Sequence, residues 1–108
     1  MGSRSRAARQ DRVTIPVVVR AAAAADLARA VSYYQGVGHG ERFRAELDRV
    51  VDRLRELPSS APVVMPEVRR ALMRRYPYAV FYLIEPQRLV VLAVLHQRAN
   101  PRRWPGGR

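Results

Sequence analysis

Residues 78–96 read Tyr-Ala-Val-Phe-Tyr-Leu-Ile-Glu-Pro-Gln-Arg-Leu-Val-Val-Leu-Ala-Val-Leu-His, two apolar runs separated by Pro86 and Gln87. Each run has the length and the β-branched and aromatic content of a strand. Because the break between them is so short, we expect the two strands to be antiparallel neighbours. Both runs are almost continuously apolar, which predicts central strands with little solvent on either face.

Two further strands are predicted around this pair. Glu67–Arg75 directly precedes it, and its many arginines predict a more exposed strand. Near the beginning of the chain, Thr14–Arg20 is a β-branched run that contains Pro16. Proline cannot donate to a strand ladder, so this strand should lie at a sheet edge or begin after the proline. Residues 59–66, with their serines and prolines, are predicted to form a loop.

Two helices are predicted between the first strand and the later ones. In the first, Asp26 is expected in the first turn, and Gly36 to Gly38 end the helix. Its apolar face is predicted to contain Ala24, Leu27, Ala28, Val31 and Tyr34. The second helix ends at Pro58 and has the clearest periodicity, with one apolar face made by Phe43, Leu47, Val50, Val51, Leu54 and Leu57.

The carboxylates of the second helix lie among arginines, away from the apolar face. Glu46, Asp48, Asp52 and Glu56 are therefore interpreted as parts of a solvated helix surface with no chemical role.

The order β-α-α-β-β-β predicts an α+β fold, with one twisted, mainly antiparallel sheet and a helical hairpin packed on one face. Residues 13–108 are expected to form a single domain. Residues 1–12 are rich in arginine and lack an apolar period, so we expect a disordered basic arm there.

The chain is strongly basic, with a net charge of +11, and all 20 basic residues are arginine. Guanidinium groups bind phosphates and carboxylates in a bidentate manner, so this charge favours an anionic or negatively patched macromolecule as partner. The chain has no cysteine, which excludes disulfides and thiolate chemistry and fits a reducing compartment. The longest strongly apolar run, Leu89–Leu95, is far shorter than the ~20 residues that cross a bilayer.

Arginines gather on two segments that the predicted sheet brings near one another. Four lie along the third-to-last strand and its end, at Arg69, Arg70, Arg74 and Arg75, and three follow the last strand, at Arg98, Arg102 and Arg103. One interpretation is a cationic groove between these segments. The other is ordinary surface arginine that protects a strand edge.

Three aromatic or imidazole residues each have two interpretations. Trp104 either binds a target or attaches the C-terminal segment to the body. His96 could transfer protons, but a histidine at the end of a buried strand more often packs locally. The tyrosines, Tyr78 among them, are expected to pack in and around the core rather than to stack on bases.

Motifs of enzymes are absent from the sequence. It has no glycine-rich phosphate loop, no HExxH and no CxxC. We therefore expect no catalytic residue, no metal site and no cofactor.

Several short motifs, in their order along the chain, resemble the RelE/ParE toxin superfamily, in particular its ParE-like, plasmid-stabilisation branch. The resemblance extends from about residue 18 to residue 104. The matching motifs are Ala25-Asp26-Leu27, Tyr33-Tyr34, Gly40-Glu41-Arg42-Phe43, Val68-Arg69-Arg70, Tyr76-Pro77-Tyr78, Phe81-Tyr82 and His96-x-Arg98-x-x-Pro101-x-x-Trp104.

This resemblance implies a cytoplasmic toxin of a type II toxin-antitoxin module, neutralised by a cognate acidic antitoxin. RelE-like members cleave mRNA on the ribosome, whereas ParE-like members inhibit DNA gyrase. In the ribosome-dependent members, basic side chains match positions 70, 72, 79 and 98, and a tyrosine matches 104. Here Arg70 and Arg98 are present, but Leu72, Ala79 and Trp104 replace the other three.

Two missing cations would cost several kcal/mol of transition-state stabilisation, since one electrostatic donor contributes about 2.7–4 kcal/mol. The sequence therefore favours a non-enzymatic gyrase inhibitor. The alternatives are a ribosome-dependent endoribonuclease and an inactive module that binds only an antitoxin. Ala99, where a second arginine often follows the first, departs from the ParE-like pattern. The candidate target-binding residues are Arg70, Arg74, Tyr78, His96, Arg98, Arg102, Arg103 and Trp104.

Overall fold

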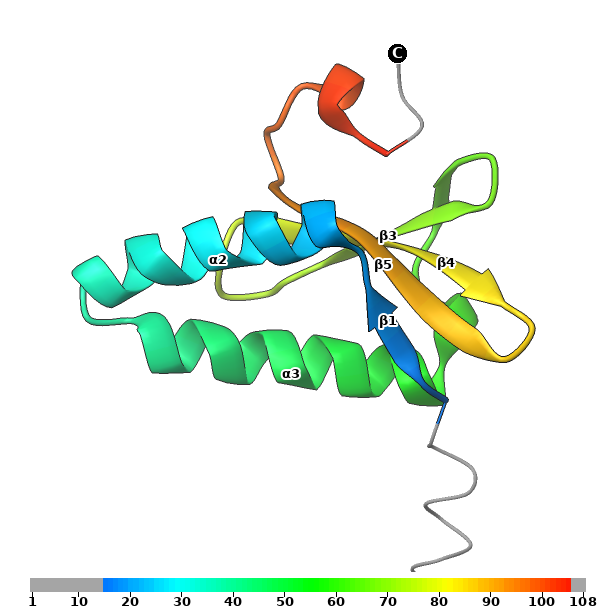
Figure 1. Cartoon of the computed structure of the whole chain (residues 1–108), viewed down its shortest axis with the longest axis horizontal. Coiled ribbons are helices and arrows are strands. Elements are labelled where there is room, and N and C mark those ends of the chain that lie inside the picture. Colours follow the sequence, from blue (N-terminus) through cyan, green and yellow to red (C-terminus); the bar gives the residue numbers. More distant parts are fainter. Residues whose placement is uncertain (1–14, 106–108) are drawn as a thin grey trace, which may run out of the picture.

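The computed structural model describes residues 15–105, which form a five-stranded sheet and a helical hairpin (Figure 1). The predicted arm of residues 1–12 lies outside the described residues. Strand β1 runs parallel to β5, and all other neighbours are antiparallel, which confirms the predicted α+β class. The sheet order is β1-β5-β4-β3-β2, with the strands β1 (Val17–Val19), β2 (Val63–Met65), β3 (Val68–Leu72), β4 (Tyr78–Glu85) and β5 (Arg88–His96).

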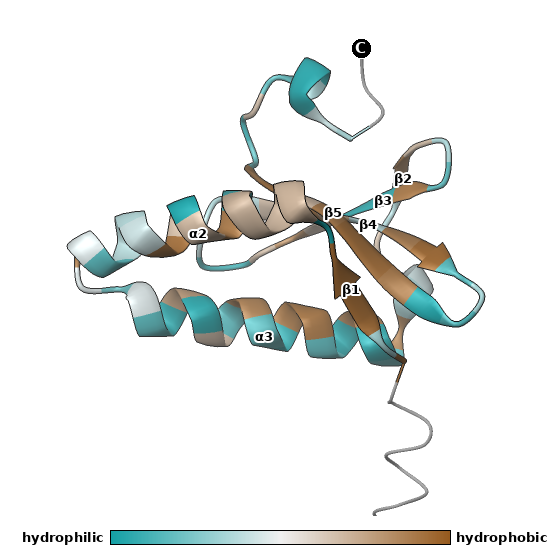
Figure 2. Cartoon of the chain, in the orientation of Figure 1, coloured by the Kyte–Doolittle hydropathy of each residue, from teal (hydrophilic) through white to brown (hydrophobic). Residues whose placement is uncertain are grey.

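Strands β4 and β5 form the centre of the sheet, as the two apolar runs predict. They pair from Tyr78 with His96 to Glu85 with Arg88, so the hairpin closes at Pro86 and Gln87. Apolar residues dominate both strands in Figure 2, and most of them are buried. Strand β1 begins after Pro16 and lies at the sheet edge, in agreement with the effect expected of the proline.

A bulge in β5 changes which of its residues face the helices. Phe81 pairs with Ala93 and Tyr82 with Val91, so Leu92 is the extra residue. Before the bulge, Val91 belongs to the core beneath the helices, and after it Val94 does. The sequence could not reveal this change from odd to even positions, because residues 89–95 are all apolar.

The sheet has a core on each face. The inner face packs against the helices through residues that include Val80, Tyr82, Leu89, Val91 and Val94. The outer face carries a smaller cluster, Val68, Ala79, Phe81, Ala93 and Leu95, against which Ala99 and Trp104 pack. Residues 97–105, the C-terminal segment, therefore cover the face of the sheet that the helices leave open.

The helical hairpin consists of α2 (Ala21–Gly36) and α3 (Gly40–Glu56), joined by a tight turn (Figure 1). Gly38 has φ = 82° in this turn, a conformation that other residues rarely adopt. The predicted face of α2 was partly wrong, because Ala24 and Ala28 are exposed, whereas Ala23 and Ala30 are buried. Five consecutive alanines at residues 21–25 offer no contrast from which a face could be read.

Asp26 does not lie in the first turn of α2, contrary to the prediction, because the helix begins at Ala21. Its carboxylate accepts a hydrogen bond from the backbone N of Val94 at 3.1 Å, and it pairs with Arg29 at 2.7 Å. Strand β1 ends at Val19, so no strand continues along this edge of β5. Asp26 thus satisfies a backbone donor on β5 beyond the last residue of β1.

Helix α3 buries Phe43, Leu47 and Leu54 as its periodicity predicts. Leu57 departs from the prediction, because it lies just beyond the end of α3 and is 55% exposed. Nearby, the hydroxyl of the fully buried Tyr82 donates to the Pro58 carbonyl at 2.5 Å and attaches the end of α3 to the sheet. Burial raises the pKa of Tyr82, although the backbone near Ala61 and the Arg69 charge oppose the shift.

The predicted loop over residues 59–66 is wrong in part. It contains the short 3-10 helix η1 (Pro58–Ser60) and the edge strand β2 (Val63–Met65), so the sheet has one strand more than predicted. The β2–β3 turn places Glu67 at φ = 65°, without the glycine or asparagine that usually indicates such a hairpin. Strand β3 spans Val68–Leu72 and is therefore shorter than the predicted strand, Glu67–Arg75.

We predict that Leu54→Ala lowers the free energy of unfolding by about 2–5 kcal/mol, because the side chain is 3% exposed in the core. Asp52→Ala, at an exposed position of the same helix, should change it by no more than about 0.5 kcal/mol. Urea titrations of the two variants measure this difference. Equal losses would contradict the assignment of the buried face of α3.

Candidate functional site: an arginine-lined cleft and a basic C-terminal segment

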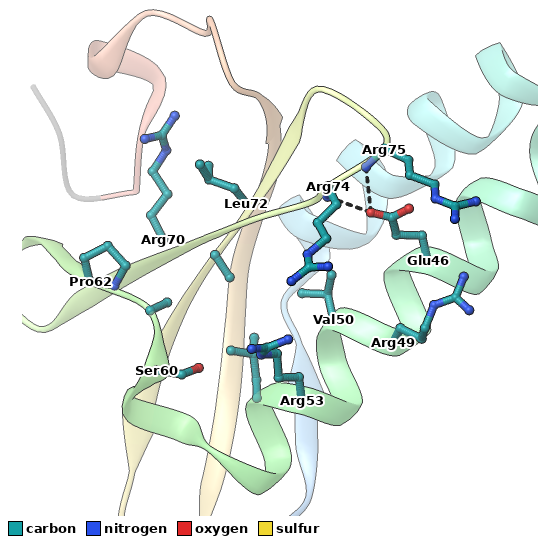
Figure 3. Close-up of a pocket in the computed structure, with 13 residues that line it drawn as sticks. Glu46, Arg49, Val50, Arg53, Ser60, Pro62, Arg70, Leu72, Arg74 and Arg75 are labelled. Carbon is teal, nitrogen blue, oxygen red and sulfur yellow. Dashed lines mark hydrogen bonds between the residues drawn. The ribbon is translucent and has the colours of Figure 1, made fainter.

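A cleft of about 590 Å³ lies between α3 and β3 (Figure 3). Two arginines line it from α3 and three from β3 and the loop after it, in the set Arg49, Arg53, Arg70, Arg74 and Arg75. The remaining lining is largely apolar and includes Val50, Leu54, Ala71 and Leu72. An apolar floor between two rows of cations fits a ligand with both apolar and acidic groups.

Among the described residues that line the cleft, Glu46 is the one carboxylate. It is only 6% exposed, and its Oε2 accepts hydrogen bonds from the backbone N of Arg74 at 2.6 Å and of Arg75 at 2.9 Å (Figure 3). The interpretation of Glu46 as a solvated side chain is therefore wrong. Glu46 fixes the loop that carries two of the arginines, and the cleft keeps a net positive charge.

On the outer face of the sheet, Arg70, Phe81 and Trp104 lie against one another. Arg70 and Phe81 are cross-strand partners on β3 and β4. The guanidinium carbon of Arg70 is 6.0 Å from the Phe81 ring centroid and 5.2 Å from that of Trp104. The Phe81 and Trp104 centroids are 5.2 Å apart. Trp104 therefore attaches the C-terminal segment to the sheet, which was one of its two predicted roles.

Tyr78 and His96 belong to a different part of the molecule. They are cross-strand partners on β4 and β5, with ring centroids 5.5 Å apart. Tyr78 also contacts Tyr34 and Phe43 beneath the helical hairpin. Burial raises the pKa of Tyr34, with smaller contributions from Tyr78, Tyr33 and Tyr76. This packing agrees with the expectation that Tyr78 packs in and around the core, whereas Tyr33 is 62% exposed.

The C-terminal segment carries three exposed arginines, Arg98, Arg102 and Arg103. Two of them lie in the 3-10 helix η2 (Pro101–Arg103), which Asn100 caps by accepting from the backbone N of Arg102 at 2.9 Å. Neither of the ion pairs found among residues 15–105 involves these arginines. The segment therefore presents three exposed cations to solvent.

Within residues 15–105, no cluster of three or more histidine, aspartate or glutamate side chains is arranged to hold a metal ion. None of the described helices has both the length and the apolar composition needed to span a membrane.

Comparisons with known proteins agree with this architecture. Residues 17–101 match the family model described as the ParE toxin of the type II toxin-antitoxin system parDE. The chain belongs to the ParE toxin family. A solved structure described as the chromosomal ParDE TA system from P. aeruginosa contains a chain with a similar fold, with a TM-score of 0.63 and 19% sequence identity. The match covers 76% of this chain and 95% of that chain. A search of curated proteins finds no match.

In this ParE-family toxin, the predicted candidate residues lie in four separate places. Arg70 and Trp104 meet on the outer face, Tyr78 and His96 pack together near the hairpin, and the exposed tail arginines lie on η2 and just before it. Arg74 lines the cleft instead. The predicted groove between the β3 arginines and the tail arginines differs from the cleft in the structure, whose opposite side is α3.

Sequence reasoning missed Arg49 and Arg53 as lining residues of the cleft. Both are among the arginines that lie between the carboxylates interpreted as a solvated helix surface. A signal was present, because each directly precedes an inward-facing residue, Val50 and Leu54, and so lies at the border of the apolar face. The sequence did not indicate which element would lie opposite these two arginines.

We predict that Glu46→Ala lowers the free energy of unfolding by about 1–3 kcal/mol, because two backbone donors lose their acceptor. Glu46→Gln keeps an acceptor oxygen and should cost less, and Asp48→Ala, at an exposed position, should cost no more than about 0.5 kcal/mol. Urea titration measures the losses, and hydrogen exchange at the Arg74 and Arg75 amides locates them. Unchanged exchange in Glu46→Ala would contradict this role.

Proposed function

We propose that this ParE-family chain is a cytoplasmic toxin that inhibits DNA gyrase by binding, without catalysing a reaction, and that a cognate acidic antitoxin neutralises it. The observation that carries the proposal is which residues occupy the outer face of the sheet. There, two of the four positions at which ribosome-dependent relatives would need cations hold Leu72 and Ala79, and a third holds Arg70, which is engaged in packing. Of these four, only Arg98 remains an exposed cation.

Position 79 gives the strongest argument against nuclease chemistry. Ala79 is fully buried and pairs with Leu72 on β3 and with Leu95 on β5. A cation at this position would have to be desolvated within an apolar cluster. Leu72 supplies no charge, and the Arg70 guanidinium packs against Trp104. Among residues 15–105, positions 72 and 79 thus contribute no donor to the converging set that phosphate cleavage requires.

The C-terminal segment supports binding as the toxic activity. Arg98, Arg102 and Arg103 are exposed on a segment that Trp104 attaches to the sheet. Arginine is among the residues that most often act as interface anchors, and fixed cations lose little entropy on binding. This surface fits an acidic region of a large protein target.

The cleft supports the second part of the proposal, neutralisation by an acidic partner. None of its described lining residues is aromatic, so it offers no ring on which bases could stack. An amphipathic acidic segment could place apolar side chains against Val50 and carboxylates against Arg49, Arg53 and Arg74. A polypeptide therefore fits the cleft better than a nucleic acid.

We expect the purified protein to inhibit supercoiling by gyrase, and Arg98→Ala and Trp104→Ala to raise the concentration for half-inhibition about 30-fold, the equivalent of ~2 kcal/mol for an interface anchor. Arg88→Ala should have no effect, because Arg88 lies at the opposite end of β5 and pairs with Glu85. Codon-dependent mRNA cleavage on isolated ribosomes, with gyrase unaffected, would instead identify an endoribonuclease. Neither activity, together with tight antitoxin binding, would identify an inactive binding module.

The cleft makes a separate prediction about the antitoxin. Arg49→Glu combined with Arg53→Glu should weaken binding of the product of the adjacent reading frame at least tenfold, a loss of about 1.4 kcal/mol or more, because both changes repel carboxylates. Arg44→Glu, an exposed position of α3 outside the cleft, is the matched control. Calorimetry on the purified proteins measures the difference. If Arg44→Glu weakens binding as much as the double variant, the partner binds elsewhere.

A further inference from the structure

Gln97 is the last residue whose hydrogen bonds attach the C-terminal segment to the body. The backbone N of Gln97 donates to the Pro77 carbonyl at 2.7 Å, and its Nε2 donates to the carbonyls of Met73 and Tyr78 at 3.3 and 3.1 Å. For residues 98–105, the hydrogen bonds that the structure contains remain within residues 96–105. Beyond Gln97, packing rather than hydrogen bonding therefore attaches the segment to the sheet.

That packing depends on one indole ring. Trp104 lies against Phe81 at an interplanar angle of 49°, and the Arg70 guanidinium lies over its ring. Apart from Trp104, the smaller Ala99 is the partly buried apolar residue of this segment that packs on the outer cluster. The three arginines of the segment add positive charge close to a body that is itself basic, so charge does not favour its attachment.

Arg70 is committed to this contact. Its Nη2 donates to the Gln97 carbonyl at 3.2 Å, while its Nε is buried and has no hydrogen-bond partner among residues 15–105. Figure 3 shows the side chain directed toward the C-terminal segment, away from Arg53 and Arg74 in the cleft. A guanidinium that gives up hydration for two aromatic faces acts as part of the packing.

We propose that Arg70 and Trp104 form a clasp, with Phe81 as its base, that holds Arg98, Arg102 and Arg103 in a fixed arrangement. Arg70 is then a positioning residue that acts through Trp104, and it does not itself contact the target. The role of the clasp in toxicity rests on the proposed binding function, but its existence does not.

The clasp has a direct consequence for binding. A free segment would lose backbone entropy when it binds, whereas a segment held by Trp104 has already lost that entropy on folding. Loss of the clasp should therefore weaken target binding while every tail arginine remains present. Arg70 and Trp104 should also behave as a unit, so that removing both costs no more than removing either one.

The chain contains a single tryptophan, so Trp104 fluorescence reports the clasp without reference to any activity. In the purified full-length protein, we expect Arg70→Ala to shift the emission to longer wavelength and to raise the acrylamide quenching constant about twofold. Trypsin should cleave after Arg98, Arg102 or Arg103 at least fivefold faster, as mass spectrometry of the first products would detect. Arg88→Ala should leave all three measurements unchanged.

Arg70→Lys provides a second variant if Arg70→Ala does not fold. It keeps the charge but loses the planar group, so we expect the same direction of change at smaller size. Far-UV circular dichroism checks that each variant is folded. Emission, quenching and cleavage equal to those of the parent protein, in a folded Arg70 variant, would overturn the clasp.

Measuring gyrase inhibition by the same variants distinguishes a failure of the clasp from a failure of the proposed function. With an inhibitory parent protein, Arg70→Ala, Trp104→Ala and the double variant should lose inhibition to the same extent, and Arg98→Ala should lose it without a change in Trp104 emission. Additive losses in the double variant would contradict action through Trp104. If fluorescence and cleavage change as expected but the parent protein does not inhibit gyrase, the clasp is supported and the proposed function fails.

Discussion

The pairing of β4 with β5 is the constraint on which the rest of this fold depends. Both strands are apolar on both faces, so the hairpin is stable in water only if each face is covered. The helical hairpin covers the inner face, and residues 97–105 cover the outer one with Ala99 and Trp104. The C-terminal segment is therefore part of the core as well as a carrier of charge.

The cleft follows from the same arrangement of layers. Helix α3 lies over the inner face, and its residues Arg49 and Arg53 line the cleft on the side opposite β3, where the sheet continues toward the edge strand β2. Glu46 spans this gap and holds the loop after β3 through two backbone amides. A buried carboxylate with two donors is well satisfied, and its single charge is outnumbered by the five arginines that line the cleft.

The sequence predicted the features that depend on local pattern. The bounds of β4 and β5, the buried residues of α3 and the edge position of β1 all follow from apolar periodicity and one proline. Prediction from the sequence failed where a segment had no periodic pattern, or where the role of a residue depended on a partner distant in the sequence. The run of five alanines gave no apolar contrast from which the buried face of α2 could be identified. The β2–β3 turn was not predicted because it contains no glycine. Glu46 and Arg49 resembled ordinary surface residues, because their roles depend on a loop nearly 30 positions away.

Arg70 borders the cleft and at the same time holds Trp104 on the opposite face. One guanidinium cannot occupy both places. A ligand that draws this group into the cleft must spend part of its binding free energy on releasing the indole, and a docked indole must weaken that ligand by the same factor. Such a ligand would couple binding in the cleft to order in the C-terminal segment through the Arg70 side chain.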